Sequence, residues 1–114
     1  MIVPATEVRI VVTTAGSPEE AERIARALVE DRLAACVNIV PGLTSIYRWK
    51  GAVETAGEIL LVIKTTQANM PGLEAAIGRM HSYEVPELLV LTVESACKPY
   101  LDWLLSCATP PDAG

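Results

Sequence analysis

The segment of this chain with the clearest capacity for chemistry is His81-Ser82-Tyr83-Glu84-Val85-Pro86-Glu87, which holds the only histidine beside two carboxylates and a phenol. Imidazole is the side chain that normally changes charge near neutral pH, and it is also the commonest ligand for transition metals. A helical pattern stops just before this segment, and an apolar strand pattern at residues 88–93 begins just after it. The sequence therefore places the candidate site at a helix-to-strand junction.

The composition bounds what this site can belong to. The 114 residues support one domain, which we assign to residues 1–109, followed by a loose C-terminal tail at 110–114. The net charge of −5 disfavours nucleic acid as a partner, since it repels phosphate backbones. No apolar run approaches the roughly 18 residues needed to cross a bilayer, so we expect no membrane insertion.

The cysteines give the expected compartment. Cys36, Cys97 and Cys107 are an odd number at unpatterned spacing, which indicates neither a disulfide framework nor a zinc knuckle. With no export signal visible at the N-terminus, we expect a cytoplasmic protein. The sequence also contains no Ser/His/Asp arrangement, phosphate-cradling glycine loop or HExxH helix, so we expect no enzymatic activity and no required cofactor.

The elements that must position the site follow from periodicity. Strand patterns cover residues 8–14, 36–40, 44–49, 53–64 and 88–93. One helix starts at Ser17-Pro18-Glu19-Glu20, an N-cap with a capping-box glutamate, and a second begins between Gln67 and Pro71 with Leu73, Ala76, Ile77 and Met80 on its buried face. A third helix covers residues 99–106. This order predicts an α+β, ferredoxin-like βαββαβ sandwich with a long β-hairpin and a C-terminal helix.

Two strand patterns indicate self-association. Residues 59–63 and 88–91 are apolar at every position, whereas a sheet covered by helices on one face only should alternate. The run 53–64 would also extend about 40 Å at about 3.3 Å per residue, beyond its own sheet. We therefore expect copies of the chain to cover the second face, the alternative being a monomer with an apolar open face.

Five segments in order, from Val8 to Leu105, resemble the divalent-cation tolerance family, CutA. They are Leu33-Ala34-Ala35-Cys36-Val37-Asn38, Ser45-Ile46-Tyr47-Arg48-Trp49-Lys50-Gly51, Ile63-Lys64-Thr65-Thr66, His81-Ser82-Tyr83-Glu84-Val85-Pro86-Glu87 and Tyr100-Leu101-Asp102-Trp103-Leu104. The resemblance implies a ferredoxin-like subunit in a cytoplasmic homotrimer, with an architecture like that of the nitrogen-regulatory PII proteins. It also implies a role in metal-ion tolerance and, in some members, copper binding.

The chain departs from family members credited with copper sites at two positions. Their strand-end cysteine corresponds to Thr13 and the first of their paired histidines to Met80, so that only His81 carries over. A hydroxyl and a thioether are poorer ligands than a thiolate and an imidazole, although a thioether suits Cu(I). We therefore expect at most weak binding of copper or zinc at His81, assisted by Glu84 or Met80. The competing interpretation is that His81 only ends a helix.

A second hypothesis places a small anionic ligand or a protein partner in a PII-like cleft between subunits. Its candidate residues are Tyr47, Trp49, Lys64, Tyr83 and Glu87. For each of them a structural role is also open: the aromatic rings could be interface anchors, Lys64 a snorkelling lysine, and Glu87 a partner of Lys64 or Arg48, or a solvated side chain. Three further residues are expected to be structural: Cys36 as a small buried hydrophobe, Gly51 in a tight reversal, and Pro86 in the junction.

Overall fold

The computed structural model describes residues 1–109, and the predicted tail at 110–114 lies outside them. An antiparallel four-stranded sheet has the order β3-β4-β2-β5, and a two-stranded sheet pairs β1 with β6. The strands are β1 (Ile2–Pro4), β2 (Val8–Ala15), β3 (Cys36–Trp49), β4 (Ala52–Thr66), β5 (Leu89–Thr92) and β6 (Ser95–Cys97). The helices are α1 (Pro18–Glu30), the 3₁₀ turn η1 (Gln67–Asn69), α2 (Met70–Met80) and α3 (Lys98–Cys107).

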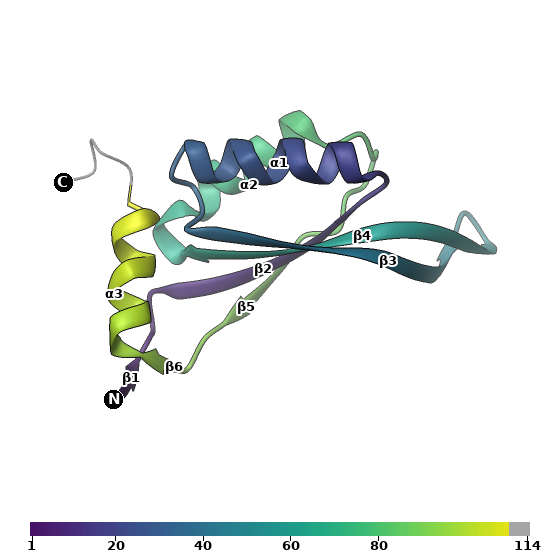
Figure 1. Cartoon of the computed structure of the whole chain (residues 1–114). Helices are drawn as coiled ribbons and strands as arrows, with labels where there is room; N and C mark the ends of the chain where they lie inside the picture. The colour runs from purple at the N-terminus through teal and green to yellow at the C-terminus, as the bar shows by residue number, and fades with distance from the viewer. Residues whose placement is uncertain (110–114) are drawn as a thin grey trace.

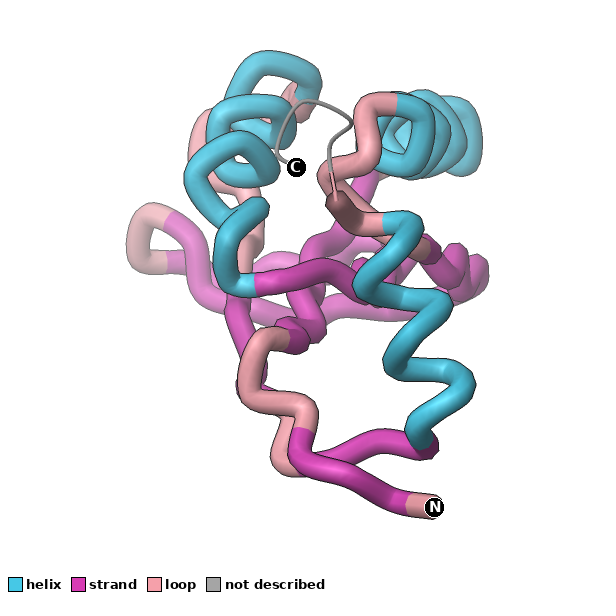
Figure 2. The backbone as a smooth tube through the Cα atoms, turned by 90° about the vertical axis from the view of Figure 1, so that its left-hand side faces the viewer, coloured by secondary structure: helices cyan, strands magenta, loops and turns pink. Residues whose placement is uncertain are grey.

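This arrangement confirms the predicted ferredoxin-like fold. The first and third strands of the βαββαβ unit, β2 and β4, are the central pair, and β3 and β5 form the edges. Helices α1 and α2 lie on one face of the sheet, and α3 stands at the end of the sheet near the N-terminus (Figures 1 and 2). No helix within residues 1–109 has the length and apolar character to cross a membrane.

The long hairpin differs from the prediction in one respect. Residues 36–40 and 44–49 are not two strands but one strand, β3, because the ladder with β4 resumes after a register shift between Val40 and Leu43. Pro41 and Gly42 lie in this irregularity, where Gly42 takes a φ of 80°. The tight reversal at the tip is confirmed, since Lys50 and Gly51 both have positive φ, at 50° and 84°.

The start of α1 follows from its sequence. Ser17 is extended at the N-cap, its hydroxyl accepts a hydrogen bond from the Glu20 N–H, and Pro18 opens the first turn. The Glu20 carboxylate does not reach back to the Ser17 N–H as a capping box would. It accepts instead from the N–H of Gly16 and from a distant loop.

The main core lies between the sheet and the two covering helices. Ile24 and Leu28 of α1 and Leu73 and Ile77 of α2 are fully buried against alternate residues of β4. Met80, predicted on the same stripe, packs against this core and is partly buried. The strands β1 and β6 were not predicted. Each has only three residues, too short for a period to be recognised.

Within residues 1–109 no helix covers the opposite face of the sheet. Strand β4 alternates fully buried residues, such as Leu61 and Ile63, with half-buried Leu60 and Val62. The register brings Val12 opposite both Val62 and Leu89, and Ile10 opposite Leu91, on the uncovered face. We call this surface the open face; its apolar residues are Ile10, Val12, Val40, Leu60, Val62, Leu89 and Leu91. The prediction that one chain leaves apolar sheet surface uncovered is thus confirmed.

Candidate functional site

The predicted helix-to-strand junction is a loop around one edge of the molecule. Helix α2 ends at His81, whose backbone is extended, with φ −77° and ψ 138°. The His81 N–H still donates a hydrogen bond to the Ile77 carbonyl. The chain then leaves the helical layer and descends to β5 on the sheet (Figure 1). Residues 81–87 therefore pass beside the turn between β2 and α1, and we call them the junction loop.

Both ring nitrogens of His81 are engaged within the chain. Its Nε2 lies 2.6 Å from the Thr14 carbonyl oxygen, and its Nδ1 accepts a hydrogen bond of 3.0 Å from the Tyr83 N–H. A carbonyl only accepts and a backbone N–H only donates, so the arrangement requires the neutral imidazole with its proton on Nε2. Ligation of a metal ion would have to break one of these two bonds. The geometry thus favours the structural interpretation of His81.

Glu20 holds the junction loop from the other side. Its side chain is buried, and its carboxylate accepts from the Ser82 N–H at 2.8 Å and from the Gly16 N–H at 3.3 Å. Burial alone would raise the pKa of Glu20, but the hydrogen bonds from Ser82 and Gly16 outweigh it and lower the pKa below its ordinary value. The ionised carboxylate therefore joins the first turn of α1 to a loop 62 residues further along the chain.

Tyr83 reaches from the junction loop to β4. Its hydroxyl donates a 2.8 Å hydrogen bond to Glu58, and burial with this bond raises the pKa of Tyr83 to about 12. Burial would raise the pKa of Glu58 as well, but hydrogen bonds from Ser45, Tyr83 and Thr14 lower it. A Cβ on Gly16 would lie 3.1 Å from the Tyr83 oxygen, so a small residue in the turn makes room for the phenol.

Residues 43–58 of β3, β4 and their connecting turn extend beyond the pairing with β2, and we call them the outer hairpin. A groove of about 600 Å³ opens beside the Tyr83–Glu58 pair, between the outer hairpin and the junction loop. Its walls are Thr14, Ser45, Ile46, Tyr47, Trp49, Glu58, Tyr83, Glu84, Val85 and Glu87. The structure thus brings together four residues of the predicted cleft, Tyr47, Trp49, Tyr83 and Glu87. Lys64 is not among the lining residues, because it lies near the far end of β4, opposite Ile10 and Cys36.

The predicted metal-binding residues are not gathered around one point. Met80 packs against the core, Glu84 lines the groove, and His81 faces Thr14 and Tyr83. Within residues 1–109 no three His, Cys, Asp or Glu side chains are close enough to hold a metal ion together. Thr13, at the position of the family's cysteine, is fully buried. This donor set does not match a preformed copper or zinc site, and metal binding at His81 remains a prediction.

The three residues expected to be structural take different places. Gly51 occupies the positive-φ corner of the hairpin tip, and Pro86 is partly buried in the junction loop. Cys36 is only half-buried, since it lies on the open face opposite Lys64 rather than in the core.

Sequence reasoning missed Glu58, which accepts the Tyr83 hydroxyl, and it missed Ser45 and Thr14, which also hydrogen-bond to Glu58. The contact between Tyr83 and Glu58 joins residues 25 positions apart, so no local pattern marks it. The available signal was a glutamate at position 58, directly before the apolar run 59–63. A charge at this place indicates that β4 leaves the shielded part of the sheet there.

Comparison with known proteins gives one consistent result. The model of the family described as "CutA1 divalent ion tolerance protein" matches residues 9–107. The "Divalent-cation tolerance protein CutA" of Thermus thermophilus is 53% identical over 95 residues, which are 83% of this chain and 92% of that protein. "Protein CutA" of Homo sapiens is 47% identical over 91 residues, which are 80% of this chain and 51% of that protein. The chain therefore spans about half the length of this relative.

Solved structures agree with the fold. A CutA from Synechococcus elongatus superimposes with a TM-score of 0.90 at 37% identity, over 95% of this chain and 96% of that one. The Thermus thermophilus divalent cation tolerance protein superimposes with a TM-score of 0.83 at 52% identity, over 85% of this chain and 94% of that one. The family model, which matches residues 9–107, includes the strands and the junction loop that form the groove.

Proposed function

Because the chain belongs to the CutA1 divalent ion tolerance family, we propose that it acts in divalent-cation tolerance as a non-enzymatic, cytoplasmic homotrimer. The names of the relatives support the tolerance role. The observation that carries the assembly is the open face, an apolar sheet surface without a helix over it. The cytoplasmic placement is supported by three free cysteines and no disulfide.

The open face is too apolar to remain in contact with water. Leu89 and Leu91 are 59% and 50% exposed, and Val40 is 40% exposed. Full burial of one such side chain contributes about 1.5–3 kcal/mol, so covering several of them favours association strongly. Large exposed apolar patches on soluble proteins commonly mark protein interfaces.

The outer hairpin offers a second surface for assembly. Pairing between β2 and β4 stops at Ala15 and Ile59, so residues 52–58 of β4 pair only with β3. This part projects as a two-stranded ribbon beyond the rest of the sheet (Figure 1). An isolated ribbon leaves backbone N–H and C=O groups unpaired on its edges, which another strand can satisfy. A neighbouring copy is the occupant that the family resemblance supports.

The assembly can be tested with one charged substitution and a matched control. Leu91→Glu places a carboxylate on the open face, whereas Val29→Glu makes the same kind of change at a 42% exposed position on α1. We expect Leu91→Glu to shift the protein to monomers in size-exclusion chromatography, while Val29→Glu elutes like the wild type. If both variants elute like the wild type, the open face is not the interface.

We propose that Cu(II) or Zn(II) binds weakly at His81, with Glu84 or Met80 assisting. The binding is weak because the metal ion must displace a hydrogen bond from the imidazole. Calorimetric titration of each ion into wild type, His81→Ala and His81→Asn tests this. The Asn variant keeps a donor and an acceptor without an imidazole, so it separates ligation from folding. Loss of binding in both variants supports the role of His81, and equal affinity in all three proteins removes it.

A second candidate function is a PII-like binding module that takes a small molecule or a protein partner in the groove. It is favoured by the volume of about 600 Å³ and by the meeting of Tyr47, Trp49, Tyr83 and Glu87. A CutA structure from Synechococcus elongatus, with a TM-score of 0.88 and 36% identity, is described as complexed with a Bis-Tris molecule. Thermal-shift screening with and without chelator separates this function from the first. Stabilisation by an organic ligand that persists with chelator supports it.

A further inference from the structure

The charged residues that line the groove are all acidic. Glu58, Glu84 and Glu87 line it, and no lysine, arginine or histidine is among its lining residues within the described part of the chain. Hydrogen bonds to Glu58 keep its pKa low although burial opposes this, so that its charge persists near neutral pH. An anion in this groove would face three carboxylates without a partner, whereas a cation would be attracted by all of them.

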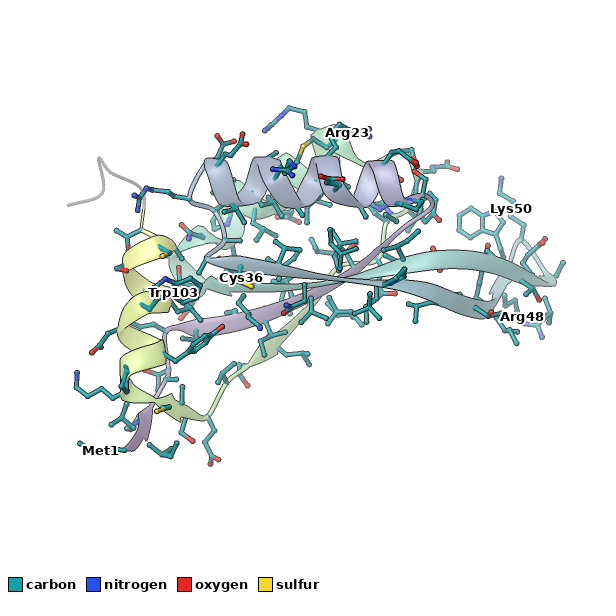
Figure 3. All side chains as sticks on the ribbon, in the orientation of Figure 1. Met1, Arg23, Cys36, Arg48, Lys50 and Trp103 are labelled. Carbon is teal, nitrogen blue, oxygen red and sulfur yellow. The ribbon has the colours of Figure 1, made fainter. Side chains whose placement is uncertain are left out.

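Aromatic rings form the opposite wall. Tyr47 and Trp49 both line the groove from β3, and they are 43% and 41% exposed in the single chain. The Lys50 ammonium, at the hairpin tip (Figure 3), already lies 5.6 Å from the centroid of the Trp49 ring. This distance is within the range of cation–π attraction, which suits organic ammonium groups well.

The same geometry disfavours a metal ion as the occupant. A groove of about 600 Å³ is far larger than one ion needs, and it is close to the size of pockets for small organic molecules. The Glu58 carboxylate already accepts a hydrogen bond from the Tyr83 hydroxyl. Within residues 1–109, no three Asp, Glu, His or Cys side chains lie close enough together to coordinate a metal ion.

We infer that the groove selects a small organic ammonium cation, held by Glu84 and Glu87 at one wall and by the rings of Tyr47 and Trp49 at the other. This inference rests on the second candidate function, that the groove is a ligand site, and it reverses the anionic ligand expected from the sequence. Lys64, which suggested an anion, lies outside the groove.

Two probes of equal shape test the sign of the charge. Choline carries a quaternary ammonium, and 3,3-dimethyl-1-butanol is its neutral isostere. Each is titrated into the full chain and followed by the indole N–H resonance of Trp49, which Trp103→Phe distinguishes from the second tryptophan. We expect choline to bind at least tenfold more tightly than the alcohol.

Two variants with the same change of net charge localise the effect. Glu87→Gln removes a carboxylate of the groove, whereas Glu94→Gln removes an exposed carboxylate that does not line it. One unit charge at about 6 Å in water changes affinity about threefold, so Glu87→Gln should weaken choline binding at least threefold and Glu94→Gln should not.

The other outcomes overturn the inference in distinguishable ways. Equal binding of the two isosteres, or tighter binding of citrate than of choline, would reject the cation while leaving the groove as a ligand site. Displacement of choline by Zn(II) with the same shift of the Trp49 resonance would assign the groove to a metal ion. No response to choline, alcohol or citrate at millimolar concentration would overturn the inference and also the small-molecule form of the second candidate function.

Discussion

Glu20→Ala should destabilise the protein because it removes the link between α1 and the junction loop. Glu20 is 5% exposed, and its carboxylate accepts a 2.8 Å bond from the Ser82 N–H and a longer, weaker 3.3 Å bond from the Gly16 N–H. A hydrogen bond to a charged group contributes about 1.5–3 kcal/mol, and the long bond adds less. We therefore expect a loss of about 2–3 kcal/mol at pH 7.

Urea denaturation at one fixed protein concentration measures this loss, since self-association makes the midpoint concentration-dependent. The neighbouring Glu19→Ala is the matched control, because Glu19 is exposed in the same helical turn and its side chain makes no hydrogen bond or ion pair within residues 1–109. We expect it to cost about 0.3–1 kcal/mol through the helix dipole alone. Glu20→Gln, which keeps one acceptor oxygen, should fall between the two.

The effect of Glu20 has a defined dependence on pH. Its pKa is lowered in the folded state, against burial, by hydrogen bonds from Ser82 and Gly16. The stabilisation is therefore complete above the ordinary value of 4.5 and is lost as the pH falls through the lower folded value. The difference between wild type and Glu20→Ala should shrink below about pH 4.5. Equal midpoints for Glu20→Ala and Glu19→Ala at pH 7 would refute the reasoning.

Three further predictions test other parts of the structure. Spectrophotometric titration should show Tyr83 ionising with a pKa of about 12. Glu58→Gln should lower this pKa, because the Tyr83 hydroxyl loses its charged acceptor. An unchanged titration would contradict the pairing. Gly51 has a φ of 84°, so Gly51→Ala should lower the free energy of unfolding by about 1 kcal/mol. Gly57 has no positive φ and has open space around it, so Gly57→Ala should lower it less. Equal losses would argue against strain in the turn. Thr13→Val should raise stability by about 1 kcal/mol, because the Thr13 hydroxyl is buried with no hydrogen-bond partner within residues 1–109, and a lower urea midpoint would indicate a partner for it.

The fold was predictable because its determinants are local. The N-cap at Ser17 and the stripe of Leu73, Ala76 and Ile77 each mark a helix within a few residues. The uninterrupted apolar run 59–63 indicated apolar residues on both faces of the sheet, and the open face confirms this. The pattern failed at Pro41, which ends most strands but here lies in an irregularity at the edge strand β3, where it need not donate a hydrogen bond.

The site was predictable only in part, because its interactions join distant segments. His81, Tyr83 and Glu87 were recognised from residue type, yet the acceptors of His81 and Tyr83 lie on strands 67 and 25 residues away. Glu20 was interpreted as a capping-box residue, because the local motif does not reveal that its carboxylate accepts from Gly16 and Ser82 instead. The sign of charge in the groove depends on which residues meet there, and spacing along the chain does not determine it.

The mass of the wild-type protein in solution tests the central claim most directly, namely that copies of the chain cover the open face. Sedimentation equilibrium at micromolar concentration should give about three times the chain mass of 12.2 kDa. A folded species of 12.2 kDa that persists at this concentration would contradict the account.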